Sequence, residues 1–68
     1  MAWCIIRRKP GRFQLYMDRH QNPPAGEWRD SGQGLPMVFQ ERWRALHQMY
    51  KLADGDPDWN YEVDEYLR

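Results

Sequence analysis

The feature that most constrains the fold is the dipeptide Pro10-Gly11, which lies between two runs rich in apolar and aromatic residues. Proline fixes φ near the value that the first central position of a β-turn needs, and glycine tolerates the positive φ of the second. The runs at residues 3–8 and 13–18 have the length of strands. The sequence therefore predicts an N-terminal β-hairpin over residues 3–18.

The turn length would also decide which face of the hairpin each side chain occupies, because a slip of one residue exchanges the two faces. A two-residue loop pairs Arg8 with Phe13, and a bulged turn would move the first strand's side chains to the other side. With the two-residue loop, the predicted core face consists of Cys4, Ile6, Phe13, Leu15 and Met17. The predicted open face consists of Trp3, Ile5, Arg7 and Tyr16.

The region after the hairpin is predicted to be a long loop, residues 19–36, because it is rich in proline and glycine. Loops of this length in compact domains are usually functional or disordered. Trp28 in its middle suggests one point of attachment, either to the body of the protein or to a partner. Residues 37–39 are predicted to form a short third strand.

The second half of the chain predicts an amphipathic helix at residues 40–53 and a strand at residues 60–67. The spacing of the apolar residues is helical up to Gly55 and Pro57, which favour a helix end. We thus expect one α+β domain over residues 1–68, of order ββ(β)αβ, with a single helix on one face of a small antiparallel sheet. The main helical stripe is Phe39, Trp43, Leu46, Tyr50 and Ala53, widened by Ala45, Met49 and Leu52. In the last strand the predicted inward residues are Tyr61, Val63 and Leu67, with Tyr66 outward.

The charges are balanced in number but unevenly placed, with 10 basic and 10 acidic residues in total. The basic residues gather at the hairpin turn, and the acidic ones in the last part of the chain. Such an arrangement could steer a partner, or the two regions could attract each other within the fold. No apolar stretch is long enough to span a bilayer, so the sequence predicts a cytoplasmic protein without a membrane partner.

The sequence does not favour an enzyme or a protein with a cofactor. Ser31 is the only serine, and no histidine lies near it in the sequence to act as its base. Cys4 lies inside a predicted strand, where a thiol is expected to be buried and unreactive. His20 and His47 lack further ligands at metal-binding spacing. The acidic residues after the helix resemble a calcium loop, but Trp59 occupies the position that requires glycine.

A protein-binding surface makes the best use of the aromatic residues that one helix cannot cover. Aromatic anchors inside a charged rim are typical of protein interfaces. The alternative is that these aromatic residues close over each other or meet their own copies in a homodimer. The predicted protein-binding residues are Trp3, Ile5, Arg7, Tyr16, Trp28 and Tyr66.

Single-stranded nucleic acid is the alternative ligand, because a basic hairpin tip beside aromatic rings can hold phosphates and stack bases. The balanced net charge and the acidic last strand weigh against it. A DNA mimic is also disfavoured, because it requires a strongly acidic surface. The candidate nucleic-acid-binding residues are Arg7, Arg8, Lys9 and Arg12.

Five motifs follow one another along the chain: Lys9-Pro10-Gly11-Arg12, Glu27-Trp28, Val38-Phe39, Ala45 and Tyr61-Glu62-Val63. Their order resembles a loose class of very small phage and prophage proteins. The class includes several anti-CRISPR proteins and small phage inhibitors of RNA polymerase. The resemblance implies a non-enzymatic inhibitor that occludes a surface of a bacterial host complex in the cytoplasm of the infected cell. A CRISPR effector is the first expected target and RNA polymerase the second.

Overall fold

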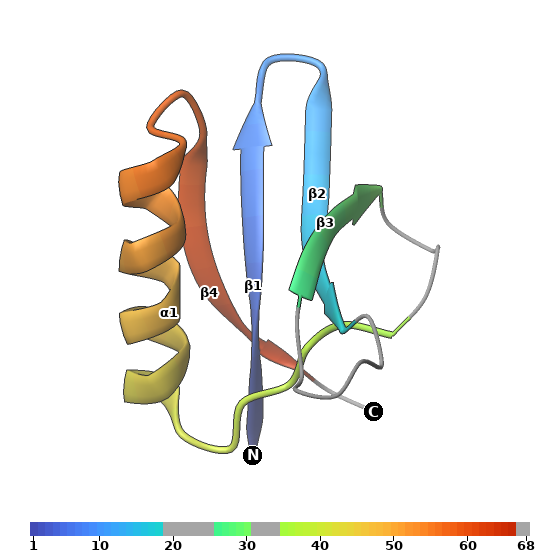
Figure 1. The fold of residues 1–68 in the computed structure, drawn as a ribbon. Coiled ribbons are helices and arrows are strands. Elements are labelled where there is room, and N and C mark those ends of the chain that lie inside the picture. The colour runs from blue at the N-terminus through green and yellow to red at the C-terminus, as the bar shows by residue number, and fades with distance from the viewer. Residues whose placement is uncertain (19–25, 31–34, 67–68) are drawn as a thin grey trace.

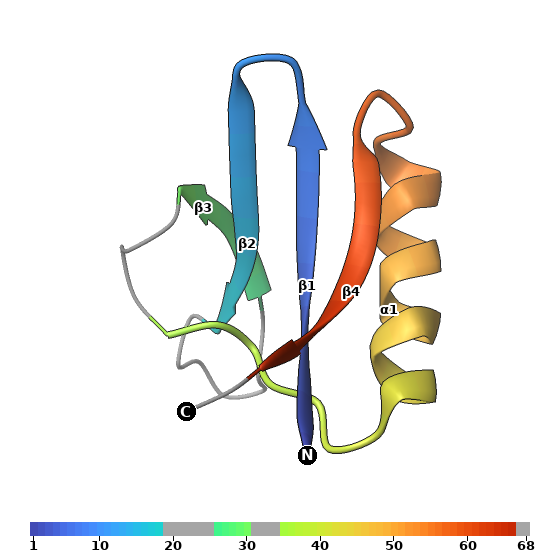
Figure 2. The ribbon, with the colours of Figure 1, turned by 180° about the vertical axis from the view of Figure 1, so that it is seen from behind.

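The fold is a four-stranded antiparallel sheet with one helix packed on one of its faces (Figures 1 and 2). The computed structural model describes residues 1–18, 26–30 and 35–66. The strand order across the sheet is β3-β2-β1-β4, which confirms the predicted α+β class. In chain order the elements are β1 (Ala2–Lys9), β2 (Arg12–Asp18), β3 (Gly26–Asp30), α1 (Arg42–Gly55) and β4 (Asn60–Tyr66).

The predicted hairpin and its two-residue loop are confirmed. Gly11 has a φ of +77°, the left-handed conformation that favours glycine at this position of the turn. Arg8 pairs with Phe13, as the two-residue loop requires. The local turn chemistry therefore determines the register of the first two strands.

The predicted strand at residues 37–39 is wrong, because residues 36–39 form only two isolated bridges, Pro36 with Met17 and Phe39 with Trp3. Trp3 and Phe39 exchange two backbone hydrogen bonds of 2.8 Å, and the N–H of Met37 donates to the carbonyl of Tyr16 at 2.9 Å. The two strands of the hairpin are paired near the turn and move apart farther from it. The segment passes through this gap, between the start of β1 and the end of β2 (Figure 1).

A strand occupies part of the predicted loop at residues 19–36, which is a correction. Residues 26–30 form β3, which pairs with β2 and places Trp28 opposite Tyr16. The centroids of these two rings are 5.0 Å apart. Gly26 permits this approach, since a Cβ at that position would lie 2.3 Å from the Tyr16 ring. The rest of the predicted loop, residues 19–25 and 31–34, lies outside the described residues.

The two faces of the hairpin are the reverse of the prediction. The buried cluster beneath α1 contains Ile5 and Tyr16, which the sequence predicts on the open face. Cys4, Ile6 and Met17 lie on the face away from the helix, although they too are buried. The alternation of the sequence could not distinguish the faces, because both carry apolar side chains. The helix packs on the face that offers the larger aromatic residues, Trp3, Tyr16 and Trp28.

The helix is rotated relative to the prediction. Ala45 and Met49 are buried in the core, so the residues expected to widen the stripe are its centre. Trp43 and Tyr50, expected inside, are 59% and 66% exposed. The helix itself is confirmed, but it starts two residues later than predicted and includes Gly55.

The predicted C-terminal strand is confirmed as β4, with Leu67 outside the described residues. Tyr61 and Val63 pack against the core cluster, as expected. Val63 pairs with Ile5, which fixes the helix face of both strands. Tyr66 pairs with Ala2 and therefore lies on the opposite face from Ile5.

Candidate protein-binding surface

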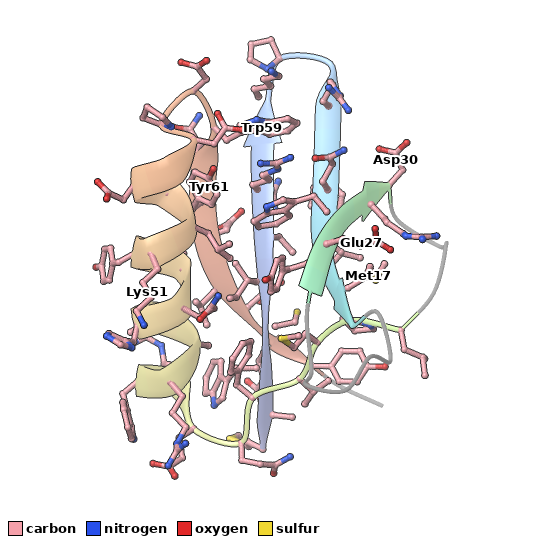
Figure 3. The ribbon with its side chains drawn as sticks, in the orientation of Figure 1. Met17, Glu27, Asp30, Lys51, Trp59 and Tyr61 are labelled. Atoms are coloured by element: carbon pink, nitrogen blue, oxygen red, sulfur yellow. The ribbon has the colours of Figure 1, made fainter. Side chains whose placement is uncertain are left out.

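The side chain of Arg7 occupies the centre of an aromatic cluster at the turn end of the sheet. Its guanidinium carbon lies 4.3 Å from the ring centroid of Trp28 and 4.1 Å from that of Trp59. Both rings can stabilise the cation through their electron-rich faces. Figure 3 shows Trp59 and Tyr61 at this end of the sheet. Only 11% of the Arg7 side chain is exposed, so little of this cation is available to a ligand.

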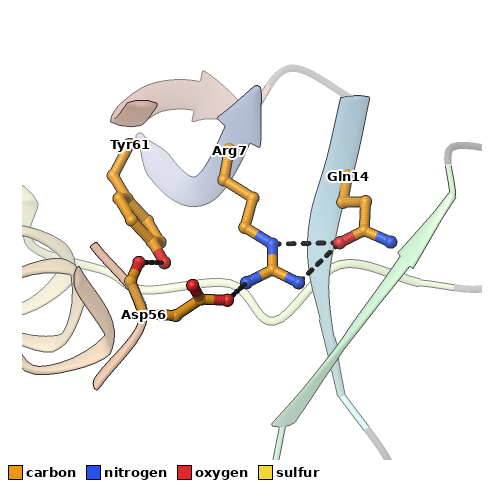
Figure 4. A network of polar contacts seen from close by, with 4 residues as sticks. All are labelled: Arg7, Gln14, Asp56 and Tyr61. Atoms are coloured by element: carbon orange, nitrogen blue, oxygen red, sulfur yellow. Dashed lines mark hydrogen bonds and ion pairs between the residues drawn. The ribbon is translucent and has the colours of Figure 1, made fainter. Parts of the chain in front are cut away.

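Polar contacts complete the environment of Arg7 (Figure 4). Its Nε and Nη2 donate to Oε1 of Gln14 at 2.9 and 2.7 Å, and its Nη1 lies 3.2 Å from Oδ2 of Asp56. The hydroxyl of Tyr61 donates to the backbone carbonyl of Asp56. The buried arginine thus joins the first two strands to the residue that follows α1.

The basic hairpin tip and the acidic second half of the chain do meet within one molecule. Besides the Arg7–Asp56 pair, Arg8 Nε lies 2.7 Å from Oε1 of Glu62. The intramolecular interpretation of the charge asymmetry is therefore confirmed for these two arginines. It also reduces the positive charge that the predicted nucleic-acid surface would offer.

The other two candidate phosphate ligands keep their charge available. Lys9 Nζ and Arg12 Cζ lie 4.4 and 5.2 Å from the Trp59 ring centroid. Within the described part of the chain, neither forms an ion pair with a carboxylate. The structure therefore divides the four basic residues into two that are neutralised and two that are not.

The six predicted protein-binding residues do not form one exposed surface. Ile5 has no exposed area, and Tyr16 is buried beside it. Trp3 and Trp28 are partly buried and pack against the core cluster. Tyr66 lies on the other face of the sheet.

The exposed aromatic surface is instead the outer face of α1. Trp43, Leu46, His47 and Tyr50 line a shallow groove of about 370 Å³. They recur at intervals of three and four residues, so they lie on one side of the helix. We call these four residues the α1 outer stripe.

The charged residues nearest the α1 outer stripe in sequence are predominantly basic. Arg44 and Lys51 lie on the helix among exposed positions, and Figure 3 shows Lys51 extending from α1. Arg44 Nε is 3.6 Å from Oε1 of Glu41, a weak surface pair. Lys51 has no carboxylate partner among the residues that the structure describes.

The helical periodicity contained a signal for this surface that the sequence interpretation missed. Two apolar stripes run along the helix, one of large aromatic residues and one centred on Ala45 and Met49. A small residue such as alanine lets a helix approach a sheet closely, so the stripe with Ala45 was the better candidate for the core. The aromatic stripe then had to face solvent.

Cys4 is the only cysteine and lies on the face of the sheet away from α1. Burial raises the pKa of its thiol, and the negative charge of Asp64 raises it further. Both effects favour the protonated thiol, which is a poor nucleophile. This agrees with the expectation of an unreactive side chain.

The described residues contain neither a metal-binding cluster nor a membrane-spanning helix. Among residues 1–18, 26–30 and 35–66, no three side chains of the metal-ligating types lie close enough together to hold an ion. The helix that the structure describes is too short and too polar to cross a membrane.

Comparison with known proteins gives no relative from which a function could be inferred. No protein-family model matches the chain, and neither a curated protein nor a solved structure is similar to it. The functional assignment therefore depends on the surface described above.

Proposed function

We propose that this chain is a non-enzymatic protein that binds another protein stoichiometrically through the α1 outer stripe. The observation that carries the proposal is the exposure of Trp43 and Tyr50, 59% and 66%, on a helix whose other face packs the core. Tryptophan and tyrosine are the residues most enriched among those that dominate binding energy at protein interfaces. Placing both beside a groove gives a partner side chain a site to occupy.

The charges beside the stripe indicate the chemistry of the partner surface. Arg44 and Lys51 would remain close to any protein docked on the helix. Complementary potentials favour encounter and fix orientation, so the partner surface should be apolar with an acidic border. A basic or fully polar partner surface would leave Trp43 and Tyr50 poorly matched.

The more specific form of the proposal is a phage-type inhibitor of a bacterial host complex in the cytoplasm. Its support is the resemblance in motif order to small phage proteins. A small folded domain with one aromatic face can inhibit by occlusion, because it covers a surface that the host machine needs. A CRISPR effector is the first target to test and RNA polymerase the second.

The experiment is an affinity purification from nuclease-treated bacterial lysate, followed by binding measurements on the purified pair. The bait is the wild-type chain, with Trp43→Ala as the test variant and Phe13→Ala as the matched control. Phe13 is also an exposed aromatic residue, but it lies in β2 on the face away from α1. Removing a central interface anchor costs about 2 kcal/mol or more, which is about 30-fold in Kd.

We expect an identified host protein to be retained by the wild type and by Phe13→Ala, and to be lost with Trp43→Ala. Calorimetry with that purified protein should then give the Kd change directly. Equal binding by all three forms would contradict the proposed surface. Retention that disappears after nuclease treatment would favour nucleic acid, and a dimeric mass by light scattering that depends on Trp43 would favour self-association.

A further inference from the structure

One edge of the sheet is formed by β4, and no other strand among the described residues pairs with its outer side. The strand order places β4 at the edge, with β1 on its inner side from the Ala2–Tyr66 pair to the Arg8–Asn60 pair. The register is continuous over these seven pairs, so the strand has no bulge that would turn its edge away. An exposed edge of this kind is a template for another strand.

The hydrogen bonds of Trp3 determine which β4 residues direct their backbone outward. Both backbone groups of Trp3 bond to Phe39, on the side of β1 away from β4. In an antiparallel pair, a residue points its N–H and C=O to the same side, and the side alternates along the strand. Glu65 is opposite Trp3, so its backbone faces away from β1. By the same alternation, the backbone groups of Tyr61 and Val63 also face outward.

These outward groups are almost entirely unsatisfied. Within the described part of the chain, the backbone N–H and C=O of Tyr61 and Val63 have no hydrogen-bond partner. The exception on this edge is the N–H of Glu65, which donates to Oδ1 of Asp64 at 2.9 Å. Tyr61 and Val63, which are consecutive among the outward-facing residues, therefore offer a complete set of backbone donors and acceptors for strand pairing.

The two faces beside this edge differ in chemistry. On the face away from the helix, β4 carries Glu62, which is paired with Arg8, and Asp64, which has no cationic partner among the described residues. On the other face, α1 lies beside β4 on the side away from β1 (Figures 1 and 2). Its half-buried residues Leu46 and Ala53 are apolar. A strand added here would meet acids on one face and apolar side chains on the other.

The same charges make a second copy of β4 an unsuitable occupant. An antiparallel β4–β4 pair would bring acidic side chains from both copies together on the shared sheet. Like charges on directly opposite residues of neighbouring strands are destabilising. The acidic edge thus selects against self-pairing and in favour of a basic strand.

We propose that the outer edge of β4 binds an extended segment of the protein partner in which basic and apolar residues alternate. The basic side chains face Glu62 and Asp64, and the apolar ones lie beneath α1. Backbone hydrogen bonds to Tyr61 and Val63 supply affinity, and the alternation supplies specificity. The inference rests on the proposed function in that the partner is a protein. Its site shares Leu46 with the α1 outer stripe and otherwise uses different residues.

The test uses a synthetic peptide of alternating lysine and valine, with both ends blocked, and the full chain labelled with ¹⁵N. Two comparison peptides separate the contributions: one alternates glutamate and valine, and one has the same lysines and valines in two blocks. Amide hydrogen exchange is measured by NMR for the outward amides of Tyr61 and Val63. The inward amides of Glu62 and Asp64, which pair with β1, are the internal reference.

We expect the alternating basic peptide to slow exchange of the two outward amides by at least about tenfold at saturation, corresponding to one added hydrogen bond each. Inward amides should be unaffected, and the other two peptides should have no such effect. Val63→Pro deletes an outward N–H without removing a bond to β1, a substitution that edge strands tolerate. It should weaken binding about tenfold, whereas Val63→Ala, which keeps the N–H, should not.

Unchanged exchange of the outward amides with the basic peptide would overturn the inference, as would equal effects of the alternating and block peptides. If Val63→Pro does not fold, the inference is tested with Asp64→Lys by measuring which peptide the variant prefers. It should shift preference from the lysine peptide toward the glutamate peptide, and an unchanged preference would also overturn the inference. If a host protein is captured in a Trp43-dependent way but the β4 amides do not respond to the peptide, strand addition is rejected and the α1 surface stands. If the β4 amides respond to the peptide but no capture depends on Trp43, the α1 surface is rejected and strand addition stands.

Discussion

Arg7 and Asp56 lie 49 positions apart in the chain and form an ion pair of 3.2 Å. Arg7 belongs to β1, and Asp56 is the residue that caps the C-terminal end of α1. The pair therefore joins the sheet to the end of the helix. The buried guanidinium, held between two tryptophan rings, makes this connection depend on one side chain.

Replacing Arg7 with alanine should destabilise the fold substantially. The variant loses the stacking on Trp28 and Trp59 and leaves Gln14 Oε1 without its donor. We expect a loss of about 2–3 kcal/mol in the free energy of unfolding, because removing one partner of a largely buried charged network is costly. Urea denaturation followed by circular dichroism measures it. Arg29→Ala, which breaks only an exposed pair with Glu27, should cost less than about 1 kcal/mol. Equal losses would show that Arg7 is not a structural centre.

The hairpin could be predicted from the sequence because its determinants are local. Pro10 and Gly11 set the turn, and the turn sets the register. The choice of covered face was not local, because it depends on which side chains α1 can pack against. Ile5 and Ile6 are equally hydrophobic. Their environments differ only because α1 and the aromatic residues of the core pack on the side of Ile5.

The two hairpin faces can be compared by truncating one residue on each. Ile5 is fully buried beneath the helix, whereas Phe13 on the opposite face is 38% exposed. Ile5→Ala should cost about 3 kcal/mol, as expected when a buried side chain leaves a cavity. Phe13→Ala should cost less than about 1 kcal/mol. Thermal and urea unfolding of both variants check this, and a reversed order would restore the face assignment predicted from the sequence.

The predicted protein-binding residues do not share one exposed surface, for the same physical reason that the predicted faces are reversed. Trp3, Ile5 and Tyr16 looked available because the hairpin was assumed to turn its other side to the helix. Strand β3 was missed because its formation depends on pairing with β2, and Trp28 has no helical or strand periodicity around it. The exposed position of Trp43 could be inferred from the sequence only by giving weight to Ala45, which marks the stripe that can approach the sheet closely.

Gly26 and Gly55 form a matched pair for testing the packing of β3 on the core. A methyl group at residue 26 would lie 2.3 Å from the ring of buried Tyr16, whereas at residue 55 nothing lies within 4 Å. Gly26→Ala should cost about 2 kcal/mol, because the ring must move within a packed core. Gly55→Ala should be neutral or stabilising by up to about 1 kcal/mol, since alanine restricts the unfolded chain. The urea denaturation midpoints of the two variants, compared with that of the wild type, measure these changes in stability. A neutral Gly26→Ala would mean that β3 does not pack closely on Tyr16.

The pKa of Cys4 predicts how stability changes in alkaline solution. Burial, followed by the charge of Asp64, raises the pKa of the folded thiol above its ordinary value of 9.0. The folded state therefore holds its proton more tightly than the unfolded state does. The stability that this difference represents is fully present below pH 9 and is lost as the pH rises through the folded pKa. Wild type should thus lose more stability than Cys4→Ala between pH 7 and pH 10.5, measured by urea denaturation under reducing conditions. Parallel losses would show that the thiol ionises equally easily in both states.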